Sequence, residues 1–296
     1  MTEALVLVVV AWIVYVSDAL WWVKPERVIL WGRTVGSLHA QFGPEYALRG
    51  DSGVFIPRLA PPFHINFEVD VTAPGRKAPA EDIVAAARAA TVAARPLSRL
   101  GILLWGYCFM VAPLLIVTGG LLRVWLPVLV GLFALAILVV ASFARQFRAL
   151  RPRDPGGWKG EALPMILSPL AAICAADNLT RSACAGFDGL AVVAALATRD
   201  DFVRIARFYY FAPREEAASA DTARLDSILD PSLRAEILQA PSPMSEEMKG
   251  YCPRCHTQLI RDNGGCPECG QTEVIPFGLS MPSGASFDTS RLAARR

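Results

Sequence analysis

Residues 101–143 read GILLWGYCFMVAPLLIVTGG, then LLR, then VWLPVLVGLFALAILVVASF, and this stretch decides the fold. Each apolar flank is about 20 residues long, and Arg123 is the only charged residue between Arg99 and Arg145. A helix rises about 1.5 Å per residue, so each flank can cross a hydrocarbon layer of about 30 Å. The alternative is a buried hairpin in a soluble core, but a core helix rarely stays apolar on every face over such a length. The sequence therefore predicts a transmembrane helical hairpin.

A third apolar run, Ala4–Val23, begins close to the N-terminus. It has neither the basic start nor the small-residue cleavage site of a signal peptide, so we expect a transmembrane helix over 1–23. Trp21 and Trp22 at its end fit an interfacial aromatic belt. Basic residues are concentrated in 24–100 and after the third span. The positive-inside rule then predicts a multi-pass protein of the cell (inner) membrane with its N-terminus outside and its C-terminal half in the cytosol.

The first cytosolic segment, 24–100, is predicted to be β-rich and to end in an Ala-rich helix. Its last predicted strand alternates apolar and polar residues strictly, with Phe67 and Val69 on one face and Glu68 on the other. The predicted strands are Arg27–Trp31, Gly53–Leu59 and Phe63–Val71, and the helix is Pro79–Arg95, which we expect Pro96 to end. His39 and His64 have no neighbours at ligand spacing, and neither receives a role.

Part of this segment resembles a known superfamily. The order is a membrane span, then KPERVILWGR at 24–33, then LRGDSGVFIP at 48–57, then a strand. It is similar to the opening of the stomatin–flotillin (SPFH) superfamily over residues 24–71. The rest of that domain and its long coiled coil have no counterpart here. The resemblance implies a membrane-organising scaffold that oligomerises, and it carries over no catalytic residues.

The chain after the hairpin is predicted to hold several small units. We expect helices at 168–181, 183–197 and 199–211, and a short one at Pro231–Gln239. The aromatic run Phe208–Phe211 fits packing better than a ligand surface. The predicted units are a basic linker at 144–162, a small helical domain at 163–212, a linker at 213–248, a zinc ribbon at 249–278 and a disordered tail at 279–296.

Four of the seven cysteines form the strongest motif in the chain, C-P-R-C followed by C-P-E-C-G after ten residues. Each C-P-x-C is a tight turn that can place two thiolates on one ion, and two such turns complete a tetrahedral S4 site. The spacing is similar to short rubredoxin-knuckle zinc ribbons. Four thiolates leave no open position, so we expect a structural zinc; iron and disulfides remain alternatives. The predicted ligands are Cys252, Cys255, Cys266 and Cys269.

Charge and motif content narrow the function. With 29 basic and 27 acidic residues, the chain has no strong field, and charges around the ribbon are balanced, which disfavours nucleic acid. We find no nucleophile with a base, no paired acids and no phosphate loop, so we expect no enzyme. The sequence favours a non-catalytic membrane adaptor or scaffold that contacts the bilayer and protein partners, with homo-oligomerisation left open.

Two other functions remain open from the sequence. One is a membrane-tethered regulator whose ribbon binds nucleic acid or senses redox state. The other is a transporter or channel, for which three spans offer only Asp18 and Arg123 as charged candidates.

Overall fold

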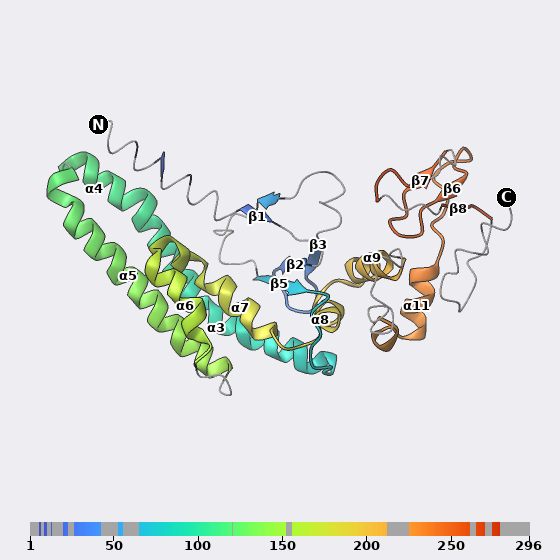
Figure 1. Ribbon diagram of the computed structural model, residues 1–296, viewed down its shortest axis with the longest axis horizontal. Helices are drawn as coiled ribbons and strands as arrows, with labels where there is room; N and C mark the ends of the chain where they lie inside the picture. The colour runs from blue at the N-terminus through green and yellow to red at the C-terminus, as the bar shows by residue number, and fades with distance from the viewer. Residues whose placement is uncertain are drawn as a thin grey trace.

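The computed structural model places a helical hairpin at one end, a sheet with its helices in the middle and a cysteine-rich ribbon at the other end (Figure 1). The residues that the structure describes are 6, 9, 10, 13, 20–22, 27–42, 53–55, 65–119, 121–151, 156–211, 225–260, 265–269 and 274–278. The strands are β1 (Leu20–Trp22), β2 (Arg27–Gly32), β3 (His39–Phe42), β4 (Gly53–Phe55), β5 (Ile65–Asp70), β6 (Gly250–Tyr251), β7 (Gln258–Leu259) and β8 (Ile275–Pro276). The helices are α3 (Ala80–Gly106), η1 (Tyr107–Val111), α4 (Ala112–Gly119), α5 (Leu121–Leu150), α6 (Trp158–Leu167), η2 (Pro169–Cys174), α7 (Ala175–Cys184), α8 (Gly189–Leu196), α9 (Arg199–Tyr210) and α11 (Pro231–Leu238).

The central sheet is antiparallel, with strand order β3-β2-β5. The apolar face of the predicted alternation is confirmed in β5, since Phe67 and Val69 are buried. The polar face is partly covered, because Asn66 is buried and Glu68 half-buried, and only Asp70 is exposed. Antiparallel neighbours share a face, so Leu30, which is paired with Phe67, is buried on the same side. Strand β3 lies outside the predicted strands.

Strand β1 corrects the end of the predicted first span. Leu20–Trp22 pairs antiparallel with β4, with Trp21 opposite Val54. β-branched and aromatic residues favour extended backbone, and here they find a partner strand. A helix in the N-terminal segment therefore ends before Leu20, and the two tryptophans belong to a sheet.

One hydrophobic core joins segments that the sequence divided. Helix α8 packs on the apolar face of the sheet and α3 packs on α8, and Ile83, Val192 and Val193 lie in the same buried cluster as the sheet residues. The same cluster takes in α9, α11 and three ribbon cysteines. Leu225 and Ile237, from the predicted linker 213–248, are fully buried in it. The sheet, the helices and the ribbon thus form a single packed head.

Helix α3 corrects the prediction that Pro96 ends the Ala-rich helix. It begins at Ala80 after Pro79, as predicted, and continues through Pro96 to Gly106. Proline removes one backbone hydrogen bond, whose freed acceptor is the carbonyl of Val92. Val92 is 60% exposed, so that turn lies on the outside of the head. Packing of the other face against the head holds the helix together across this position.

The hairpin continues α3 with a change of helical pitch. Residues Tyr107–Val111 form a π-helical turn, in which the amide of Ala112 bonds the carbonyl of Tyr107. Pro113 follows immediately and has no amide hydrogen to give, which accounts for the irregular turn. The Tyr107 hydroxyl donates to the carbonyl of Val128 in α5 at 3.0 Å. A side chain at Gly131 would overlap that ring, so glycine lets the two helices meet.

Two helical stretches, Ala80–Ile116 and Arg123–Leu150, are long and apolar enough to cross a membrane. Only 17% of the residues in the most apolar window of each are buried. Large apolar side chains face outward along both, including Met110, Leu114 and Ile137 at 65%, 64% and 63% exposure. Most of the predicted first span lies outside the described residues. Of those described before β1, Val6, Val9, Val10 and Ile13 are helical and exposed.

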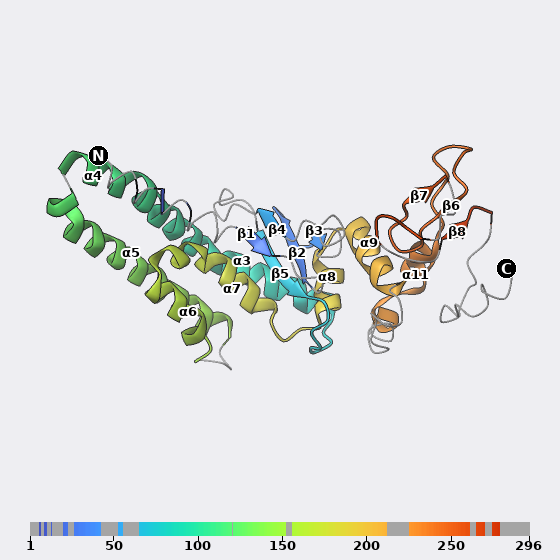
Figure 2. The same ribbon diagram turned by 45° about the horizontal axis from the view of Figure 1, so that its top comes forward.

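The segment after the hairpin is more helical than predicted. Helix α5 extends to Leu150, and α6 begins at Trp158, so it takes in the last five residues of the predicted linker 144–162. Helix α6 packs on α5, while η2 and α7 return along α3 (Figures 1 and 2). A second cluster joins these elements at the base of the hairpin, and its largest side chains include Leu97, Phe143, Phe147 and Met165.

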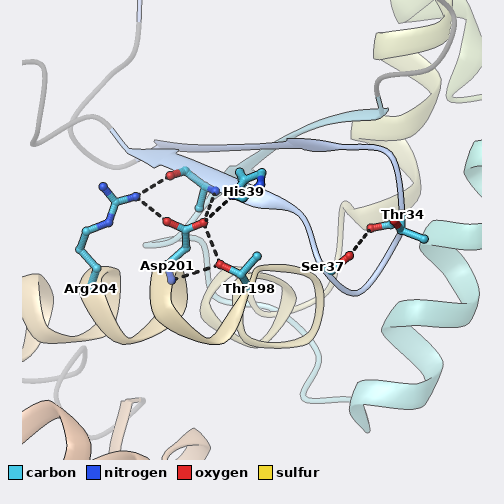
Figure 3. Close-up of polar contacts among 7 residues, drawn as sticks. Thr34, Ser37, His39, Thr198, Asp201 and Arg204 are labelled. Atoms are coloured by element: carbon cyan, nitrogen blue, oxygen red, sulfur yellow. Dashed lines mark hydrogen bonds and ion pairs between the residues drawn. The ribbon is translucent and has the colours of Figure 1, made fainter.

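Helix α9 covers strand β3, one of the two edge strands of the sheet (Figure 3). Asp201 accepts from the amide of Ala40 at 3.1 Å, and Arg204 donates to the carbonyl of the same residue at 2.7 Å. Thr198 caps the start of α9 by accepting from the amide of Asp201 at 3.3 Å. Unpaired edge groups invite pairing with other chains, and this pair of side chains occupies them.

Candidate metal centre

The first cysteine turn lies between two paired strands. Strand β6 leads into Cys252 and β7 begins shortly after Cys255. Two backbone bonds close the turn, both of 2.9 Å: the amide of His256 donates to the carbonyl of Cys252, and the amide of Cys252 donates to the carbonyl of Thr257. Strand β8 pairs with the other side of β6, so the ribbon has a third strand within the predicted range 249–278.

The structure brings the four predicted ligands together. All four Sγ atoms lie within 4.8 Å of one another. The distance from Cys252 Sγ to Cys269 Sγ is 3.4 Å, and that from Cys255 Sγ to Cys266 Sγ is 3.5 Å. An S4 tetrahedron with metal–sulfur bonds of about 2.3 Å has edges of about 3.8 Å. The spacing is far longer than a disulfide bond and close to that edge, so the donor set fits a tetrahedral thiophilic ion.

Backbone amides point at the sulfurs, as the C-P-x-C pattern predicts. The amide of Cys255 donates to the Cys252 sulfur, and the amide of Thr257 donates to that of Cys255. The pKa of Cys255 lies below the ordinary value of a thiol. The causes are hydrogen bonds to its sulfur, first from the thiols of Cys252 and Cys269 and then from Thr257. The bonds among these thiols also raise the pKa of Cys252, so without an ion the environment favours the metal-binding thiolate form at Cys255 and not at both sulfurs.

The ribbon is docked on α9 through a buried arginine between two ligands. Arg254 is only 7% exposed, and its guanidinium carbon lies 3.8 Å from the centre of the Phe208 ring. Its Nε also donates to the carbonyl of Phe208 at 3.2 Å. Cys252, Cys266 and Cys269 are buried in the same cluster as Phe208. The cluster of four cysteines is thus part of the core of the head.

His256 occupies an unusual backbone position directly after Cys255. Its φ is 60°, in the left-handed region that favours glycine. Its ring lies against Tyr251 at 5.8 Å between centroids, and burial lowers its pKa to about 4. It is not a ligand, since within the described ranges the one group of side chains that could hold a metal ion is the four cysteines.

The other side chains weighed from the sequence have packing roles. Phe208 and Phe211 are 5% exposed each, so the aromatic run packs between the sheet and the ribbon, as expected. The lone Cys184 is buried, which raises its pKa to about 12 and leaves it protonated. His64 lies outside the described residues.

His39 has a partner that sequence spacing did not show. Its Nδ1 lies 3.5 Å from a carboxylate oxygen of Asp201, 162 residues later (Figure 3). That oxygen also accepts from Ala40 and Thr198, and the other oxygen accepts from Arg204. The carboxylate is therefore engaged in holding the sheet edge. The T-x-x-D pattern at Thr198 is a helix-start signal that indicates its cap, but nothing local indicates its pairing with β3.

Comparison with known proteins adds no relative. No protein-family model, no curated protein and no solved structure matches the chain. The resemblance of residues 24–71 to the stomatin–flotillin superfamily gains no support from these comparisons. The four clustered cysteines remain consistent with a zinc ribbon on their own geometry.

Proposed function

We propose that this protein is a non-catalytic membrane-anchored scaffold. It holds its head, which contains a structural zinc site, at the cytosolic surface of the membrane. In this proposal the hairpin of α3, α4 and α5 spans the bilayer, a third span precedes β1, and the N-terminus and Arg123 lie outside. The observation that supports this proposal best is the apolar hairpin. Only 17% of the residues in the most apolar window of each helix are buried, while the base of the hairpin is packed against the rest of the protein. Residues 1–19 suffice for about 28 Å of helix, close to the hydrocarbon thickness.

The proposed zinc is structural. Four buried or half-buried sulfurs surround the site, which leaves no coordination position for water or substrate. A ribbon with strands of two residues each cannot stabilise itself by burial alone. The ion would therefore supply its folding energy, and Arg254 would transmit that order to α9.

The proposed partner surface lies on the ribbon, at the end farthest from the hairpin (Figure 1). Met244 and Ile260 are 85% and 50% exposed there. Both lie next to β7, since the amide of Met244 donates to Gln258 Oε1 at 2.7 Å and Ile260 directly follows the strand. Strand β7 is also an edge of its sheet. Exposed apolar side chains beside an edge strand suit a protein partner.

Purification of the intact protein from its native membrane in mild detergent tests this function. Elemental analysis should find one zinc per chain, and mass spectrometry should find a defined set of proteins that is lost from the double variant Met244→Asp/Ile260→Asp. The control Arg88→Ala, on the exposed side of α3, should keep that set. Co-purifying nucleic acid, or iron in place of zinc, would shift the assignment to a membrane-tethered regulator.

Topology is tested separately by surface labelling of whole cells. A cysteine at Arg123, at the hairpin tip, should react with an impermeant maleimide above the wild-type background. A cysteine at Ser242 should not. Labelling at Ser242 would overturn both the orientation and the expectation of reduced thiols in the ribbon.

A further inference from the structure

Helix α6 exposes an apolar edge although it lies beyond the hairpin. Ala162 and Met165 are buried in the cluster at the hairpin base, while the opposite edge is open. The exposed side chains of that edge are Leu163, Ile166 and Leu167, at 55%, 50% and 75% exposure. No charged residue occurs from Ala162 to Ala176, so the turn from α6 into η2 is uncharged throughout.

The position of this turn matches the start of the apolar part of α3. A Cβ at Gly101 would lie 3.0 Å from the carbonyl oxygen of Ile173, so η2 touches α3 at that level. Gly101 comes two residues after Arg99, the last charge before the hairpin. The end of η2, five residues after the turn at Ser168, therefore lies where the surface of α3 changes from charged to apolar.

The segment from α6 to α7 begins and ends away from the apolar part of α3. At its start, Trp158 lies under the guanidinium of Arg148, with 5.1 Å between the guanidinium carbon and the ring centroid. At its end, α7 runs back to the sheet, where Thr180 donates to the carbonyl of Asn66 at 2.7 Å. The chain thus goes toward the apolar part of the hairpin and returns without crossing it (Figures 1 and 2).

Charge at the base of the hairpin favours a lipid surface. In the described residues 95–101, 145–151 and 156–161, the basic side chains outnumber the acidic ones by six to one. The basic ones are Arg95, Arg99, Arg145, Arg148, Arg151 and Lys159, and the acidic one is Glu161. Such a collar attracts the anionic lipids of the cytosolic leaflet. It lies on α3, at the end of α5 and at the start of α6, the elements against which the segment of the uncharged turn packs or from which it begins.

We propose that the α6–η2 turn inserts into the interfacial layer of the cytosolic leaflet, with Leu163, Ile166 and Leu167 among the acyl chains. This inference rests on the proposed membrane insertion of the hairpin. The turn acts as a second, non-spanning contact that fixes how deep the head sits. Trp158 and the basic collar remain at headgroup level, where aromatic and basic side chains anchor interfacial elements.

Photo-crosslinking of the full chain in nanodiscs of phosphatidylethanolamine and phosphatidylglycerol tests the insertion. The photoreactive residue p-benzoyl-phenylalanine is placed at Leu167 in the turn, at Leu114 in the hairpin, or at Met244 on the ribbon. All three positions are exposed, so each variant should fold. Irradiation followed by mass spectrometry should find lipid adducts at Leu167 and Leu114, with at least tenfold fewer at Met244.

The outcomes separate this inference from the function on which it rests. Lipid adducts at Leu114 with none at Leu167 would overturn the insertion of the turn and leave the hairpin in the membrane. Crosslinks from Leu167 to protein, including a second copy of this chain, would also overturn it. Failure at both positions would overturn the proposed membrane function itself. Adducts at Met244 as frequent as at Leu167 would refute a specific lipid contact.

Discussion

Replacement of Arg254 by alanine should release the ribbon from α9 without removing its metal. The arginine lies between Cys252 and Cys255 in sequence but supplies no ligand atom. Its contacts run to Phe208 instead, through a stacked guanidinium and a hydrogen bond to the carbonyl. Docking and metal binding therefore depend on different side chains of the same turn.

The magnitude follows from those two contacts. A cation–π contact at a desolvated site is worth about 2 kcal/mol, and a hydrogen bond from a charged donor about 1.5–3 kcal/mol. The two share one guanidinium and do not add fully, so Arg254→Ala should destabilise docking by about 3 kcal/mol. Each 1.4 kcal/mol is a factor of ten, so the undocked population should rise by more than about 100-fold. Arg254→Lys keeps the charge but not the planar fork, and should lose about half of this.

Hydrogen exchange, measured by mass spectrometry on the full chain in detergent, reports the population in which the ribbon is undocked from α9. Amides in the last turns of α9, which the ribbon covers, should exchange faster in Arg254→Ala. Amides in the first turns of α3 should not change, because they pack elsewhere in the head. Zinc content should stay at the wild-type level in the same sample.

Two results would refute the reasoning. Unchanged exchange in α9 would mean that apolar contacts of the ribbon suffice for docking. Loss of zinc together with faster exchange would mean that docking and coordination cannot be separated. The variant Arg88→Ala, from an exposed position on α3, controls for the removal of an arginine as such.

The remaining predictions concern the ribbon turn, the sheet edge and the hairpin. At His256, the glycine variant should be more stable than the alanine variant by about 1 kcal/mol, because only glycine adopts φ 60° without strain; thermal melts of zinc-loaded protein compare the two. Asp201→Ala removes a bond to Ala40 and a helix-start contact, and should lower the free energy of unfolding by about 2 kcal/mol in denaturant titrations. Gly131→Leu should drive Tyr107 out of its site and lower the melting temperature of the protein in detergent.

Each of these has a matched control. If the two His256 variants were equal, the left-handed backbone at this position would be unsupported. For Asp201, the neighbouring Asp200→Ala should have a smaller effect, and equal effects would argue against the edge contact. For Gly131, the exposed substitution Val130→Leu should be silent, and equal losses would contradict close helix contact.

Periodicity and local chemistry predicted several elements well. The alternation in β5, the start of α3 after Pro79 and the S4 cysteine set all depend on residues within one short segment. Such patterns carry their own geometry, because strand and helix periods and turn chemistry act locally. The aromatic run at Phe208 was also expected to pack, which its burial confirms.

The errors occurred where distant segments decide the structure. Pro96 reads as a stop signal, but the packed face of α3 outweighs one lost hydrogen bond. Leu20–Trp22 reads as the end of an apolar span, but β4, over thirty residues later, pairs with it. The contact from Arg254 to Phe208 joins residues 46 apart and has no sequence period at all. Tertiary contacts override local preference in each case.

Helix α3 connects the head rigidly to the hairpin. Its Ile83 is buried in the core of the head, and the helix continues without interruption to Gly101, a distance of about 27 Å along its axis. In the proposed membrane arrangement, a change of about 10° in hairpin tilt would swing that end of the head sideways by about 5 Å, and thinner or thicker bilayers change tilt in this way. The position of the ribbon relative to the membrane surface would then change with the thickness of the bilayer.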